Sequence, residues 1–210
     1  MAVLKHVYLV RHGETDSNVD GIFRGRDSAL TDRGREQARI VAGRIGRLNV
    51  EALVSSTYPR ALDTAGAIAE VTGLMVEPHE LFVEAKEASA LRGKPKDHPE
   101  RVAALAAMDA QNHPEYRHSD EENFRELSER ARAALDFLRH HEAASLCVVT
   151  HGAFLRVLTG SVLFRDDFLR SQFVQMLRHF KTENTGVSHI CYTDDQGWQL
   201  ITLNDDAHLL

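Results

Sequence analysis

Short apolar runs alternate with amphipathic helical patterns along most of the chain, and this alternation constrains the fold more than any other feature. We predict strands at 5–10, 52–55, 74–77, 146–150, 187–193 and 198–203. Helical patterns lie at 30–48, 60–73, 121–141 and 154–164. Strands that alternate with helices predict an α/β fold with a mostly parallel sheet covered on both faces. The turn TDDQG between the last two runs predicts a hairpin, which places an antiparallel strand at one edge.

Composition and charge narrow the class of protein. The 210 residues are enough for a large hydrophobic core, and the net charge is −6 with no basic stripe interleaved with aromatics, which argues against nucleic acid as a partner. The isolated Cys147 and Cys191 lie in apolar runs, as expected of core residues in a reducing compartment. The start of the chain does not resemble a signal peptide, and no apolar run approaches 18 residues. We therefore expect a cytoplasmic protein that does not bind membranes.

Residues 85–121 interrupt the alternation with mixed charges and three of the five prolines. Ligands of open α/β folds bind outside the carboxyl ends of the parallel strands. We therefore predict one domain over 1–210, in which 85–121 is an insertion that lies over that end as a lid.

Cationic and imidazole side chains follow three of the predicted strands. Arg11, His12 and Gly13 end the first strand, Arg60 follows the second at the start of a helix, and His151 with Gly152 follows the fourth. One histidine or arginine after a strand is usually structural. Because the carboxyl ends of parallel strands meet at one edge, the set of three predicts an anion site beside helix N-termini.

The segments LVRHGET, GREQA, SSTYPRALDTA and VVTHG resemble the histidine phosphatase superfamily, which is also called phosphoglycerate mutase-like. The closing NDDAHL is similar to the end of its small bacterial phosphatases, such as alpha-ribazole phosphatase. The resemblance implies a three-layer α/β/α sandwich with a mixed, mostly parallel six-stranded sheet. It also implies a phosphohistidine intermediate, with His12 as the nucleophile.

The resemblance extends to further site residues. Arg11, Arg60 and His151 match the residues that bind phosphate in the family, and Asn18 matches an auxiliary one. In the family, the carbonyl of Gly13 accepts the other ring N–H of the nucleophile. Two arginines supply the charge that metal ions supply elsewhere, so we expect no metal and no cofactor. The expected substrate-binding set is Arg11, Asn18, Arg24, Gly25, Arg60, His151 and Gly152.

Transfer to a histidine also requires a proton for the leaving oxygen. In the family, a glutamate in a Leu-x-Glu pattern after the third strand supplies it. Here Phe82-Val83-Glu84 fits if Phe82 takes the leucine's place, so Glu84 is the expected acid and Glu87 the alternative.

Two stretches separate this chain from the mutases of the family. Mutases carry Glu-Arg-x-Tyr-Gly where this chain has EAKEA at 84–88, and Asn-Arg-Phe-Ser-Gly where it has GIFRG at 21–25. Arg24 adds a cation near the expected pocket, and Arg92, Lys94 and Lys96 in the insertion could hold a second acidic group of a substrate or be solvated.

We therefore expect a metal-independent phosphatase acting on a small phosphorylated metabolite. A cofactor-dependent phosphoglycerate mutase is the first alternative, and a non-catalytic phospho-ligand-binding protein is the second. The oligomeric state is open, with a homodimer as one candidate, and the residues do not name the substrate.

Overall fold

The computed structural model describes residues 3–22 and 24–210 and contains a six-stranded sheet in the order β3-β2-β4-β1-β5-β6. The strands are β1 (Lys5–Arg11), β2 (Ala52–Ser55), β3 (Val76–Pro78), β4 (Ser145–Thr150), β5 (Val187–Thr193) and β6 (Gly197–Asp205). The first four strands in the chain pair in parallel, and β5 runs antiparallel to both β1 and β6. The predicted mixed, mostly parallel sheet with an antiparallel hairpin at one edge is confirmed.

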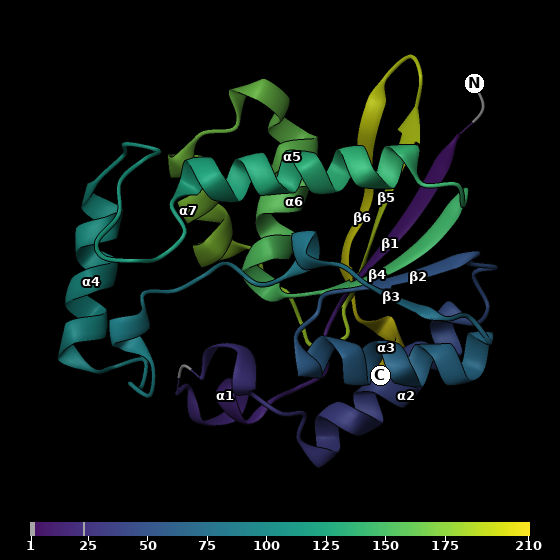
Figure 1. Ribbon diagram of the computed structural model, residues 1–210, viewed down its shortest axis with the longest axis horizontal. Helices are drawn as coiled ribbons and strands as arrows, with labels where there is room; N and C mark the ends of the chain where they lie inside the picture. Colours follow the sequence, from purple (N-terminus) through teal and green to yellow (C-terminus); the bar gives the residue numbers. More distant parts are fainter. Residues whose placement is uncertain (1–2, 23) are drawn as a thin grey trace.

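Helices cover both faces of this sheet, as Figure 1 shows. One layer contains α2 (Asp32–Ile45) and α3 (Pro59–Thr72), and the other contains α5 (Phe124–His140), α6 (Gly152–Phe164) and α7 (Arg170–His179). The three-layer α/β/α sandwich is thus confirmed.

Alternation of side chains along the central strands builds the two cores between these layers. In β4, Leu146 and Val148 pack into the core under α5 and α6, whereas Cys147 and Val149 pack into the core under α2 and α3. Successive side chains of a strand point to opposite faces, so a strand buried on both faces reads as a continuous apolar run. This explains why apolar and polar residues do not alternate in the run at 146–150.

The local signals at helix ends behave as their chemistry predicts. The Oγ1 of Thr31 accepts the N–H of Gly34 at 3.0 Å and caps α2, and Gly73 ends α3 with a left-handed φ of 70°. The third strand begins at Val76 rather than at 74, because Leu74 lies in the connection that leaves this cap.

The sequence patterns did not predict the short helices α1 (Asp16–Asp20) and α4 (Pro99–Ala110), nor α7. The described part of the chain also contains five 3₁₀ turns: η1 (Gly25–Asp27), η2 (Glu80–Phe82), η3 (Ser89–Leu91), η4 (Arg165–Asp167) and η5 (Ala207–Leu209).

Residues 85–121 contain η3 and α4, which share a small core of Ala88, Leu91 and Ala104. In Figure 1, α4 and α1 both lie on the side of the molecule where β1 ends. Whether this segment acts as a lid of a single domain stays a prediction. Within the described ranges, no helix is long and apolar enough to cross a membrane.

Candidate active site

The side chains predicted to converge do meet at one edge of the sheet. Because β2, β4 and β1 are parallel neighbours, the residues after them lie together. The Nε of Arg60 is 3.1 Å from the Nε2 of His12, and the ring centroids of His12 and His151 are 5.1 Å apart. All three side chains are buried, with 6%, 4% and 0% exposed.

Hydrogen bonds fix the tautomer of His12. Its Nδ1 lies 2.7 Å from the carbonyl oxygen of Gly13, which can only accept, so the proton is on Nδ1. Its Nε2 is then the acceptor of the Arg60 N–H. Burial, reinforced by the charges of Arg60 and Arg11, lowers the pKa of His12 well below its usual value. The imidazole is therefore neutral at pH 7 and carries a lone pair on Nε2.

Close backbone contact requires glycine at both 13 and 34. A Cβ on Gly13 would lie 2.4 Å from the carbonyl oxygen of Gly34, and a Cβ on Gly34 would lie 2.0 Å from that of Glu14. The N–H of Gly13 is held by Thr64 Oγ1 at 3.1 Å, which links it to α3. The two glycines thus let the first turn of α2 approach the loop that carries His12.

His151 is held in the same tautomer as His12, with its proton on Nδ1. The Oγ of Ser56 accepts the N–H of Tyr58 at 3.2 Å and lies 2.7 Å from Nε2 of His151. Ser56 is fully buried, and its hydroxyl has no other acceptor within the described residues, so it donates to that nitrogen. The ring proton is then on Nδ1, which is buried and has no hydrogen-bond partner within the described residues. Burial, followed by the neighbouring His12, Arg60 and Arg11, lowers the pKa of His151 well below its usual value.

The two arginines are anchored by backbone carbonyls. Arg11 Nη1 donates to Thr182 O, and Arg60 Nη1 donates to Gly25 O at 2.9 Å. Burial lowers the pKa of Arg11 to about 10, so the guanidinium stays charged at neutral pH. Its buried Nε lacks a partner within the described chain, and a Cβ on Gly152 would lie 3.4 Å from this atom. Gly152 therefore lies directly against the Arg11 guanidinium.

The two candidate acids have different surroundings. The carboxylate of Glu84 accepts the N–H groups of Phe154 at 2.9 Å and Ala153 at 3.2 Å, at the start of α6. Burial lowers the pKa of both Arg11 and Arg60, and the negative charge of Glu84 is the largest influence that raises it again.

Glu87 instead forms an ion pair with Arg101 at 3.3 Å, and burial raises its pKa. Of the two carboxyl groups, Glu84 is thus the one whose charge acts on Arg11 and Arg60.

A cavity of about 160 Å³ opens over Arg11, His12 and Arg60, whereas His151 and Gly152 are not among its lining residues. Its lining contains most of the predicted substrate-binding residues, both candidate acids and two cations of the insertion, and includes Arg11, His12, Asn18, Arg24, Gly25, Arg60, Glu84, Glu87, Lys96 and Arg101. Across the described chain, no three His, Cys, Asp or Glu side chains gather as metal ligands.

The other predicted cations near the cavity are paired with acids. Arg24 binds Asp20, Arg92 binds Asp27, and Lys94 binds Glu100. Arg24 still lines the cavity, but it shares its charge with a carboxylate. Phe23, which belongs to the motif at 21–25, lies outside the described residues.

Sequence patterns missed Asn184, which holds two site residues. Its Nδ2 donates to His12 O at 2.9 Å and to Asn18 Oδ1 at 3.1 Å. The same Oδ1 accepts the N–H of Thr15 at 3.1 Å, so the amide NH₂ of Asn18 is left to face the cavity. Asn184 precedes β5 in a loop with no strand or helix period, and no local signal could have found it.

Comparison with known families agrees with this geometry. The family model described as histidine phosphatase superfamily (branch 1) matches residues 7–206. The chain belongs to the histidine phosphatase superfamily. Membership confirms the resemblance drawn from the motifs and supports an enzyme of the phosphoric monoester hydrolase class.

Curated relatives of similar length carry a mutase name. The probable phosphoglycerate mutase GpmB of Enterobacter sp. (strain 638) is 31% identical over 97% of this chain and 94% of its own. The protein of the same name from Photorhabdus laumondii is 30% identical over the same shares.

Similar solved structures carry phosphatase names. A phosphoserine phosphatase mutant from Entamoeba histolytica, in complex with phosphoserine, has a TM-score of 0.83 and 24% identity, over 98% of this chain and 100% of its own. A putative alpha-ribazole-5'-P phosphatase from Escherichia coli has a TM-score of 0.79 and 22% identity, over 96% of both chains. At these identities the likeness establishes the fold.

Proposed function

We propose that this protein is a metal-independent phosphatase that hydrolyses a small phosphorylated metabolite through a phosphohistidine on His12. The observation that carries the proposal is the pair of fixed tautomers. His12 offers a neutral lone pair on Nε2, and His151 offers, beside two arginines, an Nδ1–H that no described residue accepts. A phosphate monoester is the ligand that needs both a nucleophile and several convergent donors.

In the first step, Nε2 of His12 attacks phosphorus as the bond from phosphorus to the leaving oxygen breaks. Arg11, Arg60 and His151 donate to the phosphoryl oxygens, whose charge must be stabilised in the transition state. Glu84, protonated in the substrate complex, gives its proton to the leaving oxygen, and an alcohol departs.

In the second step, water attacks the phosphohistidine. The Glu84 carboxylate takes a proton from the water as the nitrogen–phosphorus bond breaks. Inorganic phosphate forms, the His12 lone pair returns, and Glu84 regains its proton, so no other reactant is consumed.

The names of the curated relatives favour a second candidate, a cofactor-dependent phosphoglycerate mutase. A mutase must hold a second anionic group of its substrate while the phosphoryl group returns to it. Here the stretches at 21–25 and 84–88 differ from the mutase motifs, and Arg24 and Arg92 are paired with acids. These features favour water as the acceptor.

The same proposal includes the role of residues 85–121. Glu87, Lys96 and Arg101 of this segment line the cavity of about 160 Å³, which suits a small substrate. We propose that the segment is a lid within a single domain. Cytoplasmic location and a homodimer stay predictions.

A screen of phosphorylated metabolites and p-nitrophenyl phosphate, run in EDTA, tests the function. We expect phosphate release by the wild type and none by His12→Ala, whose fold is checked by circular dichroism. The screen includes 3-phosphoglycerate with a bisphosphoglycerate primer. Isomerisation faster than phosphate release would establish the mutase, binding without turnover would establish a ligand-binding protein, and loss of activity in EDTA would exclude the metal-independent mechanism.

A further inference from the structure

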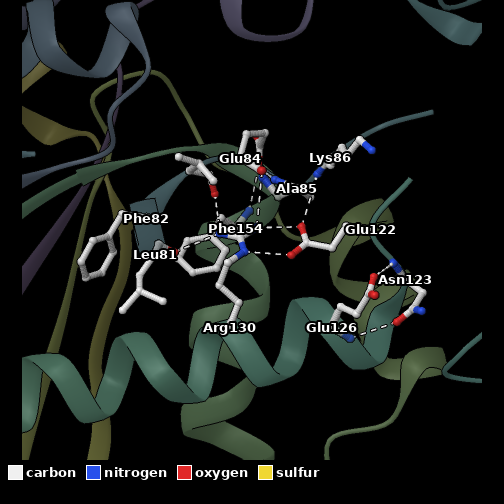
Figure 2. Close-up of polar contacts among 12 residues, drawn as sticks. Leu81, Phe82, Glu84, Ala85, Lys86, Glu122, Asn123, Glu126, Arg130 and Phe154 are labelled. Atoms are coloured by element: carbon white, nitrogen blue, oxygen red, sulfur yellow. Dashed lines mark hydrogen bonds and ion pairs between the residues drawn. The ribbon is translucent and has the colours of Figure 1, made fainter. Parts of the chain in front are cut away.

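Arg130, in the middle of α5, reaches the chain that carries Glu84. Its Nη1 donates to Leu81 O at 2.9 Å and to Val83 O at 2.7 Å, and its Nη2 lies 3.4 Å from Glu84 O. Figure 2 shows the guanidinium of Arg130 between α5 and this chain. The Arg130 side chain thus donates hydrogen bonds to three backbone carbonyls within residues 81–84.

The guanidinium of Arg130 is itself held by Glu122 and by the ring of Phe154. Glu122 accepts from Nε and from Nη2, each at 2.8 Å, and the two side chains are only 16% and 14% exposed. The guanidinium carbon lies 4.2 Å from the ring centroid of Phe154, whose N–H binds the Glu84 carboxylate (Figure 2). A bidentate, partly buried arginine loses little further freedom when it binds carbonyls, so it is a stiff support.

Glu122 also joins the two ends of the 85–121 segment. Its N–H donates to Lys86 O at 2.9 Å, and its Oε2 lies 3.3 Å from the N–H of Lys86. The pair of Arg130 and Glu122 therefore fastens three parts to each other: α5, the chain before Glu84, and the base of the segment.

We propose that Arg130, supported by Glu122, is a positioning residue that fixes the carboxyl group of Glu84 for proton transfer to the leaving oxygen. The inference rests on the proposed phosphatase function. Arg130 is not among the residues that line the catalytic cavity, so it acts through the backbone of 81–84. Displacement of a catalytic group by about 1 Å can cost about a hundredfold in rate.

Arg130→Lys is the first test, because lysine keeps the charge beside Glu122 but cannot serve three carbonyls in fixed directions. Alcohol release is followed in single turnovers with enzyme in excess, which isolates transfer to His12. For the alkyl phosphate that the wild type hydrolyses fastest, we expect a tenfold to hundredfold loss, on the order of that cost of misplacement. For p-nitrophenyl phosphate the loss should be under about threefold, since this leaving group hardly needs a proton.

Arg125→Lys on the same helix is the matched control. Arg125 is exposed and pairs with Glu129 and Glu115, so its replacement should leave both rates unchanged. Glu122→Gln removes the charge that holds the guanidinium while Arg130 remains. We expect it to slow transfer from the alkyl phosphate more than transfer from p-nitrophenyl phosphate, as Arg130→Lys does. It provides a second variant if Arg130→Lys unfolds.

A double-mutant cycle separates positioning from general damage. In a Glu84→Gln background, Arg130→Lys should cost less than about twofold, because the group that it positions is already absent. Equal losses for both substrates, or the full loss repeated in that background, would overturn the inference and leave the phosphatase function standing. A wild type that releases neither alcohol would overturn both.

Discussion

Arg60 donates its Nε–H to the Nε2 of His12 across 3.1 Å, so the lone pair proposed to attack phosphorus is engaged by a cation in the free protein. Attack requires this hydrogen bond to be released, and the phosphoryl oxygens offer the guanidinium a charged acceptor instead. The same contact holds the imidazole neutral, since a second positive charge beside Arg60 is unfavourable. In the proposed mechanism, Arg60 therefore adds to burial in keeping His12 neutral and also binds the phosphoryl group.

The first prediction concerns stability against pH. Burial, Arg60 and Arg11 lower the pKa of His12 far below the value of 6.5 in an unfolded chain. Below pH 6.5, His12 therefore binds a proton in the unfolded state but not in the native state. Stability is therefore lost as pH falls through 6.5, by up to about 1.4 kcal/mol per pH unit for each such histidine. Urea denaturation of wild type and His12→Ala at pH 7.5, 6.5 and 5.5 should show a shallower loss in the variant. Parallel losses would contradict it.

The second prediction assigns the acid. Glu84→Gln should lower kcat by about 10²–10⁴-fold for an alkyl phosphate and much less for p-nitrophenyl phosphate, when transfer to His12 limits the rate. Glu87→Gln is the matched control, because Glu87 lines the same cavity but pairs with Arg101. A hundredfold loss for Glu87→Gln alone would assign the proton to the other carboxyl group.

The site was predictable from the sequence wherever a residue of the site belongs to a short local motif. The apolar runs located β1 and β4, and the residues after them had to meet because parallel neighbours end at one edge. The exposed α4 was missed, since its helix carries only a weak apolar stripe and its larger apolar side chains Val102 and Leu105 face solvent.

The supports of the site were not predictable in the same way. Ser56, Arg130 and Asn184 act through hydrogen bonds to residues 95, 47–49 and 172 positions away. No periodicity or spacing in the sequence reports such contacts. The same limit applies to Arg24. The sequence indicated a cation near the pocket, but it did not indicate the ion pair of Arg24 with Asp20.

The third prediction compares two helical glycines. A Cβ on Gly43, inside α2, would meet nothing within 4 Å, so Gly43→Ala should stabilise the fold by up to about 1 kcal/mol. A Cβ on Gly160, inside α6, would lie 2.2 Å from the ring of Phe168, so Gly160→Ala should cost about 1–3 kcal/mol through overpacking. Urea denaturation measures both, and a stabilised Gly160→Ala would show that the ring yields freely.

The fourth prediction tests Asn184. Its amide is a donor to His12 O and to Asn18 Oδ1, so without it the NH₂ of Asn18 is no longer held toward the cavity. If Asn18 thereby loses one hydrogen bond to the ligand, worth about 0.5–1.5 kcal/mol, the inhibition constant of inorganic phosphate should rise up to about tenfold in Asn184→Ala. Asn184→Leu restores the volume without the donors and should be as weak as the alanine variant. If leucine instead recovers wild-type phosphate binding, Asn184 only fills space, and the orientation of Asn18 must be set by Thr15 alone.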